Sequence, residues 1–202
     1  MSISLKKGQK ISLSKEAAGM SRMMVGLGWD PREAGGGGKG ILGSLFGAKQ
    51  ADVDCDASVF MLDENSKMHK KGNLVYYGRL VSNCGSIKHM GDNLTGDGAG
   101  DDEQIMVDLQ KIPGDVHKLV FVVNIYDCLN RKQHFGMIQN AFIRIVDLTS
   151  NKEILKYNLS DQYMGSTAVI VGEIYRHDNE WKFGAIGEGT NDASLSELAR
   201  RY

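Results

Sequence analysis

The sequence predicts an all-β protein, a two-sheet β-sandwich with short peripheral helices. Three observations favour this class. Apolar residues recur with a period of two along most of the chain, strand-length segments alternate with turn residues, and 25 Gly accompany only 2 Pro. The length of 202 residues favours a single domain over 1–202, and it is enough chain to bury a core without a disulfide or a metal staple.

The expected strands follow one another closely along the chain. The run LVFVVNIYD at 119–127 is almost continuously apolar and predicts a central strand, whereas IMVDL at 105–109 alternates and predicts a half-exposed strand. The complete set of expected strands is 11–13, 22–29, 55–62, 74–80, 86–90, 104–109, 118–126, 141–146, 153–158, 168–176 and 181–187.

Turn and helix signals fall between and after these strands. Residues 177–180, HDNE, separate two strand-like runs and predict a hairpin connection. Ser194 and Glu197 have the spacing of a capping box, which predicts a short C-terminal helix that covers one end of the sandwich. A further helical turn is expected within 132–139, although Gly136 costs about 1 kcal/mol relative to Ala in a helix.

One compositional break interrupts the pattern, the Gly-rich segment AGGGGKGILGSLFGAKQA at 34–51. We interpret it as a loop insertion, because Gly-rich chain has much entropy to lose on ordering. The alternative is a docking segment, since Ile41, Leu42, Leu45 and Phe46 form a small apolar patch that a partner or a membrane surface would cover. A phosphate-binding loop is excluded because Gly40, rather than Ser or Thr, follows Lys39.

Composition excludes several classes of protein. A formal net charge of -1, from 24 basic and 25 acidic residues, gives no electrostatic signal for nucleic acid or an anionic membrane. Cys55, Cys84 and Cys128 lack C-x-x-C spacing, which argues against a disulfide framework and a zinc site. The sequence shows no apolar signal core and no apolar run near the roughly 20 residues of a transmembrane segment. We therefore expect a cytoplasmic protein.

The acidic stretch GDNLTGDGAGDDE at 91–103 contains no Lys or Arg and is the strongest functional signal. Two carboxylates about 5 Å apart repel by about 3 kcal/mol at an effective dielectric near 20, so a folded cluster needs protonation, solvent or a metal ion. Hard oxygen ligands, with Gly91 and later glycines that let backbone carbonyls turn inward, favour calcium. The carboxylate ligands expected here are Asp92, Asp97, Asp101, Asp102 and Glu103.

Other acids stand where strands begin or end. Asp54 and Asp56 are two apart on an extended segment, so both carboxylates point to one side. An EF-hand is excluded because Ala57 occupies the position of its required Gly. Asp30 ends the run MMVGLGWD, and Asp127 ends LVFVVNIYD. If these acids meet the acidic stretch at one end of the sandwich, they supply oxygens for one or two calcium ions.

These motifs together resemble the TerD family of bacterial tellurium-resistance and general stress proteins. The matching segments span nearly the whole chain outside the Gly-rich insertion. They are GLGWD at 26–30, DCDAS at 54–58, GDNLTGDGAGDDE at 91–103, VDLQKIP at 107–113, FVVNIYD at 121–127, FGMIQNAFIRIV at 135–146 and GEIYRHDNEWKFGAIGEG at 172–189.

The resemblance implies a calcium-binding β-sandwich encoded among similar stress-response proteins. We expect no catalytic activity, and we expect partners among other stress or tellurium-resistance proteins or membrane-associated complexes. The acidic motif of the family falls on Asp92, Asn93, Asp97, Asp101, Asp102 and Glu103, and its other acidic positions fall on Asp30, Asp54 and Asp56.

Two departures from the family pattern and one alternative function stay open. The 34–51 insertion lengthens the connection after Asp30, and Cys55 replaces a bulkier apolar residue; we interpret Cys55 as a buried core thiol rather than a redox centre. Clustered carboxylates also suit a metal-dependent phosphoryl hydrolase. The sequence offers that alternative little support, because it contains neither H-E-x-x-H nor G-x-S-x-G.

Overall fold

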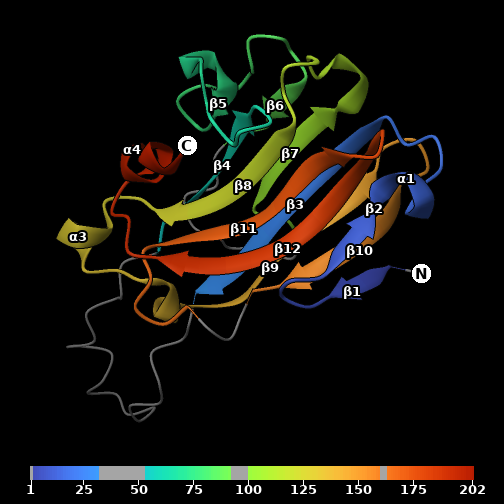
Figure 1. Ribbon diagram of the computed structural model, residues 1–202. Helices are drawn as coiled ribbons and strands as arrows, with labels where there is room; N and C mark the ends of the chain where they lie inside the picture. Colours follow the sequence, from blue (N-terminus) through green and yellow to red (C-terminus); the bar gives the residue numbers. More distant parts are fainter. Residues whose placement is uncertain (1, 32–52, 92–99, 160–162) are drawn as a thin grey trace.

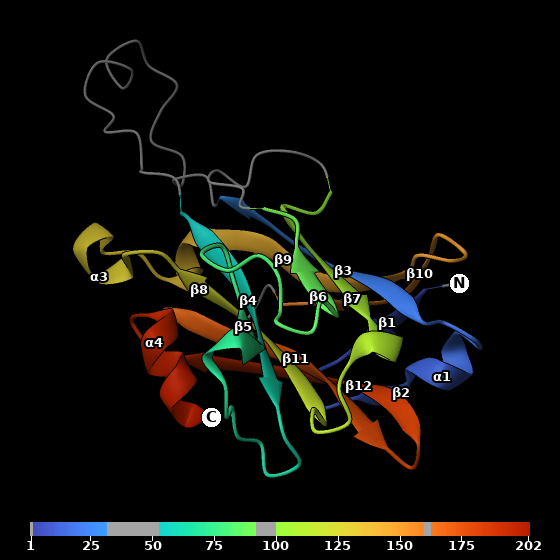
Figure 2. The same cartoon turned by 90° about the horizontal axis from the view of Figure 1, so that it is seen from above.

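The computed structural model describes residues 2–31, 53–91, 100–159 and 163–202, and it confirms the expected sandwich of two sheets (Figures 1 and 2). The first sheet has the strand order β1 (Ile3–Leu5), β10 (Lys152–Asn158), β9 (Ile138–Asp147), β3 (Arg22–Pro31), β7 (Glu103–Asp108) and β6 (Ile87–His89). The second sheet has the order β2 (Lys10–Ser12), β12 (Glu180–Thr190), β11 (Ala168–His177), β8 (Lys118–Ile125), β4 (Cys55–Leu62) and β5 (Leu74–Val75). Neighbouring strands are antiparallel except for the parallel pair β1 and β10.

The core lies between the sheets, and the residues of β4 contribute apolar side chains to both faces of the second sheet. Cys55, Ala57 and Val59 belong to the large buried cluster between the sheets, whereas Phe60 and Leu62 belong to a second cluster on the outer face of the second sheet. The predicted central strand is confirmed, because β8 lies between β11 and β4 and is buried along nearly its whole length. The predicted alternation of β7 is confirmed as well.

Short helices lie around the sandwich. They are α1 (Leu13–Glu16), α3 (Cys128–Arg131) and α4 (Leu195–Leu198), with the 3-10 turns η1 (Lys71–Asn73), η2 (Leu109–Lys111), η3 (Phe135–Met137) and η4 (Ala199–Arg201). None of the helices in the described ranges is long and apolar enough to span a bilayer. The predicted C-terminal helix is confirmed: α4 lies against the outer face of the second sheet, where Leu198 joins the outer cluster (Figure 2).

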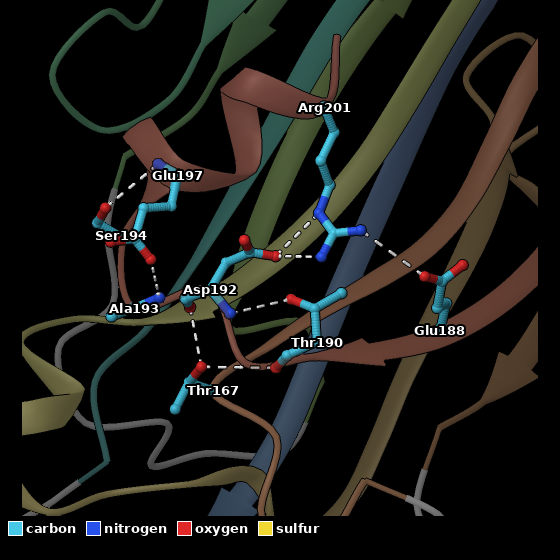
Figure 3. Close-up of polar contacts among 8 residues, drawn as sticks. All are labelled: Thr167, Glu188, Thr190, Asp192, Ala193, Ser194, Glu197 and Arg201. Carbon is cyan, nitrogen blue, oxygen red and sulfur yellow. Dashed lines mark hydrogen bonds and ion pairs between the residues drawn. The ribbon is translucent and has the colours of Figure 1, made fainter.

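The start of α4 is capped as the sequence predicts, with one difference. The Ser194 hydroxyl accepts the N–H of Glu197 at 3.3 Å, but the Glu197 carboxylate accepts the N–H of Ala193 at 2.8 Å, one residue before the usual partner in a capping box (Figure 3). The hairpin over 177–180 is also confirmed, since Asp178 and Asn179 both have positive φ, as a two-residue type I′ turn requires.

Two expected elements were wrong in extent. The strand expected over 74–80 ends at Val75, because Tyr76 and Arg79 exchange both backbone hydrogen bonds, at 3.1 and 2.8 Å, and so close a tight turn. The helical turn expected over 132–139 is only η3, since Lys132 adopts a left-handed φ of 53° and ends α3. Strand β1 and helix α1, which are three and four residues long, were not predicted.

One end of the sandwich gathers the predicted acidic residues. We call it the carboxylate end: there β3 and β8 finish, and β4 and β7 begin (Figure 1). Strand register fixes this arrangement, because Cys55 lies opposite Ile125 across the β4/β8 pair, and Leu27 lies opposite Glu103 across the β3/β7 pair.

Candidate metal centre

The described residues supply part of the predicted calcium site. Asp92, Asn93 and Asp97 lie outside them, as does the Gly-rich segment 34–51. The members that can be placed are Gly91, Asp101, Asp102, Glu103, Asp30, Asp54, Asp56 and Asp127. Within the described ranges, no three His, Cys, Asp or Glu side chains form a group that could hold a metal ion. The described acids alone therefore do not complete a coordination sphere.

The side chains of the last three residues of the acidic motif, Asp101, Asp102 and Glu103, point in different directions. Asp101 lies over the outer face of the first sheet, where Arg144 of β9 holds it with two hydrogen bonds, Nε to Oδ1 at 2.7 Å and Nη2 to Oδ2 at 2.9 Å. Gly26 leaves room for this carboxylate, since a Cβ atom there would collide with it. The hydrogen bond to Asp101 is the main reason why the pKa of Arg144 is raised. Arg144 thus provides the cation that the motif itself lacks.

Asp102 and Glu103 connect the same motif to two other strands. Asp102 Oδ2 accepts the N–H of Trp29 in β3 at 2.7 Å. Glu103 points inward, where its Oε2 accepts the N–H of Ala57 in β4 at 2.5 Å and lies 3.6 Å from His89 Nε2, with both side chains fully buried. The motif therefore ties the beginning of β7 to both sheets, which fixes the point where the acidic stretch rejoins the sandwich.

Asp54 and Asp56 belong to the opposite side of β4. Because Cys55 and Ala57 face the core, Asp56 faces outward, directly across from Asn124 of β8. Asp56 is 3% exposed, and Ser58 on the same face is fully buried. Asn124 Oδ1 and Ser58 Oγ have no hydrogen-bond partner among the described residues. This face of β4 therefore combines a buried carboxylate with two neutral oxygens that have unused lone pairs, and all three are donors for a hard cation.

The remaining acids at this end contact surface groups. Asp54 Oδ2 lies 3.3 Å from Arg131 Nη1 at the end of α3. Asp127 is exposed at the N-cap of α3, and it accepts a hydrogen bond from Asn130 Nδ2 at 2.7 Å. Asp30 accepts a hydrogen bond from Asn140 Nδ2 at 2.8 Å. Asp30 and Asp127 thus lie at the predicted end of the sandwich, each turned towards a side-chain amide.

The pKa of the Cys55 thiol reflects the negative charges around it. Its thiol is buried, as expected, and burial is the main cause that raises its pKa well above the usual value. The negative charges of Asp56, Glu103, Asp54 and Asp102 raise this pKa further. We call these four residues the Cys55 cluster. These carboxylates therefore lie near the thiol, with Asp54 and Asp56 on one face of β4 and Glu103 on the other.

Sequence reasoning missed four residues of this region. Arg144 and Arg131 pair with predicted ligands, and Asn124 and Ser58 add neutral oxygens. A signal existed for Arg144, which is the charged residue within the apolar run AFIRIV at 141–146. A signal existed for Asn124 as well, because it is the polar residue within VFVVNI at 120–125. Arg131 and Ser58 had none, since Arg on a short helix and Ser in a strand are ordinary.

Comparisons with known proteins agree with this architecture. The model of the TerD domain matches residues 1–202. Stress response protein SCP2 of Bacillus subtilis is 61% identical over 202 residues, which cover 100% of both chains. Tellurium resistance protein TerD of Serratia marcescens is 42% identical over 189 residues, 94% of this chain and 91% of that one.

A solved structure shares the fold. It is the crystal structure of a homologue of telluride resistance protein (TerD) from Streptomyces coelicolor A3(2), which matches with a TM-score of 0.66 and covers 89% of this chain and 98% of that chain. Its sequence identity is 19%, so the likeness supports the arrangement of the two sheets and nothing more specific.

Proposed function

The chain belongs to the TerD family of stress-response and tellurium-resistance proteins, and from this premise we propose that it is a calcium-binding stress protein that acts through other proteins rather than by catalysis. In this proposal calcium binds at the carboxylate end and holds the acidic stretch against the sandwich. The bound form then presents a surface to other tellurium-resistance or stress proteins, or to membrane-associated complexes.

The observation that carries the proposal is the Cys55 cluster. Two pairs of carboxylates, Asp54 with Asp56 and Asp102 with Glu103, lie near Cys55 at the beginning of β4, and like charges that lie near one another repel. A divalent cation offsets this repulsion. The adjoining oxygens of Asn124 and Ser58 fit calcium, which takes six to eight oxygen ligands and accepts neutral ones.

The predicted ligands have different roles in this proposal. Asp54, Asp56, Asp102 and Glu103 lie where a cation would gain most from their charge. Asp101 has both oxygens engaged by Arg144, so we assign it the role of an anchor for the acidic stretch. Asp92, Asn93 and Asp97 stay sequence-based predictions, as do Gly91, Asp30 and Asp127. Bound calcium supplies positive charge and cross-links these segments.

Calorimetric titration of metal-free protein with calcium tests the proposal. We expect wild type to bind calcium in preference to magnesium, and we expect Asp56→Asn to weaken the affinity at least about tenfold, because it removes one charged ligand. The matched control is Asp115→Asn, which removes an equal charge from a side chain that is 68% exposed and pairs with Lys70. This control should bind calcium as wild type does.

Three results would contradict the proposal. The first is the absence of binding heat from wild type at millimolar calcium, and the second is a calcium affinity of Asp56→Asn equal to that of wild type. The third is a preference for magnesium or manganese accompanied by turnover of a phosphate ester, which would favour the metal-dependent hydrolase instead. Thermal melts provide a second readout, because a ligand that binds only the folded state raises Tm in step with its concentration.

A further inference from the structure

Resting on the proposed calcium binding, we infer that Arg131 is a built-in competitor of calcium. It neutralises Asp54 in the metal-free protein and gives up this carboxylate when the ion binds. The exposed surface made by Tyr77, Tyr126, Leu129 and Arg131, which we call the Tyr126 surface, therefore changes with metal occupancy.

Helix α3 places Arg131 at this position. The helix begins after Asp127, whose backbone carbonyl accepts the N–H of Arg131 at 3.1 Å. It ends immediately afterwards, because Lys132 is left-handed and its N–H caps carbonyls of the same turn. Tyr126 is tied in turn to the Asp54 backbone by an N–H to carbonyl bond of 2.8 Å. The guanidinium and its carboxylate are thus delivered by two segments that are hydrogen-bonded to each other.

The two arginine pairs of the carboxylate end differ in strength. Arg144 donates two short hydrogen bonds to Asp101, from Nε and from Nη2, whereas Arg131 Nη1 lies 3.3 Å from Asp54 Oδ2. The Arg131 side chain is also 35% exposed, so water competes for it. Asp54 itself is only 11% exposed and belongs to the Cys55 cluster. A divalent ion beside Asp54 and Asp56, which share one face of β4, would interact with both carboxylates, so it would displace the weaker arginine and leave the stronger one in place.

Displacement of Arg131 has a consequence at the surface. Its guanidinium lies 5.1 Å from the centre of the Tyr126 ring, and Tyr126 meets Tyr77 edge-on at 6.4 Å. Tyr77, Tyr126 and Leu129 are 43%, 45% and 70% exposed. When Asp54 no longer holds the guanidinium, this cation becomes available above the exposed ring of Tyr126, which contacts Tyr77, a combination that suits an acidic or aromatic group on a protein partner.

The first test compares the calcium affinities of Arg131→Gln and wild type. Removal of a competitor should tighten binding about three- to tenfold, the range expected for loss of one partly exposed ion pair. The control is Arg22→Gln, which removes the same charge from an exposed side chain at the opposite end of β3. In an Asp54→Asn background, Arg131→Gln should leave the affinity unchanged, because a competitor acts only through the carboxylate for which it competes.

The second test follows wild type directly by NMR. The Nε–Hε signal of Arg131, assigned by its loss in Arg131→Lys, should shift during a calcium titration and saturate together with the binding isotherm. The Arg144 signal should move far less. This measurement keeps the inference testable even if Arg131→Gln folds poorly.

The outcomes separate the two proposals. If wild type binds calcium while Arg131→Gln binds equally or more weakly, and the Arg131 signal stays fixed, then competition by Arg131 is wrong and calcium binding stands. If wild type does not bind calcium at all, the proposed function fails and this inference fails with it.

Discussion

Two acid-rich regions of the molecule differ in how their charges are neutralised. In the C-terminal region, Arg201 holds Asp192 through Nε at 2.9 Å and Nη2 at 2.7 Å and approaches Glu188 at 3.9 Å, while Glu197 accepts a backbone N–H (Figure 3). At the carboxylate end, four carboxylates instead act on the thiol of Cys55. Asp192 and Glu188 share one arginine, whereas the acids near Cys55 contact separate partners, namely Arg131 and the N–H groups of Trp29 and Ala57.

The comparison also explains what each region does for the fold. The hydrogen bonds and ion pairs in Figure 3 hold α4 and its flanking turn over an apolar cluster that includes Phe60, Val122 and Leu198. These contacts therefore stabilise the cover of the second sheet. The acids near Cys55 instead tie the beginning of β7 to both sheets, through the N–H groups of Trp29 and Ala57. In the proposed function, a cation bound there would offset the repulsion among these carboxylates.

The largest effect is expected from Gly28→Ala, which should displace the backbone that positions Asp101 at the carboxylate end. A Cβ atom at Gly28 would lie 2.7 Å from the Gly100 carbonyl and 2.5 Å from the Phe142 ring. Relief of this overlap pushes away the backbone just before Asp101, so we expect a loss of about 2 to 3 kcal/mol in unfolding free energy and weaker calcium binding. Urea denaturation measures the loss. Gly114→Ala is the control, because nothing lies within 4 Å of its new methyl group; equal stability of the two variants would contradict the prediction.

A matched pair of acid-to-amide substitutions tests the comparison itself. In the presence of chelator, Asp56→Asn should raise the unfolding free energy by about 1 kcal/mol, because it removes a buried charge that shares one face of β4 with Asp54. Asp192→Asn should lower it by about 1 kcal/mol, because it breaks the two-point pair with Arg201. Thermal melts at neutral pH and low salt measure both changes. The same sign for both variants would show that the two regions do not differ in the proposed way.

The smallest effect concerns pH and the C-terminal region. Burial raises the pKa of Tyr202 from 10.0 to about 12, so folding favours the protonated phenol. The resulting stability is complete below pH 10 and is lost as the pH rises towards 12. Wild type should therefore lose about 1 kcal/mol more than Tyr202→Phe between pH 9 and pH 11. Denaturation curves at these two pH values measure the difference, and parallel losses would contradict it.

The sequence predicted those parts of the molecule that depend on local pattern. Period-two segments predicted most strands, and acids at strand ends predicted that these carboxylates gather at one end of the sandwich. Partner choice was not predictable, because Asp101 and Arg144 are brought together only by the register of β3 with β9 and β7. The face of β4 on which Asp56 lies was equally unpredictable. Alternation puts Asp54 and Asp56 on the same face, but only packing decides that Cys55 faces the core and that the two acids face outward.

The buried thiol of Cys55 has a chemical consequence for its reactivity towards oxidants. A thiol reacts with such oxidants through its thiolate, and four neighbouring negative charges, together with burial, suppress that form. The Cys55 sulfur is therefore poorly reactive towards such oxidants. The carboxylates that we propose as calcium ligands thus also protect the thiol of β4 from oxidation.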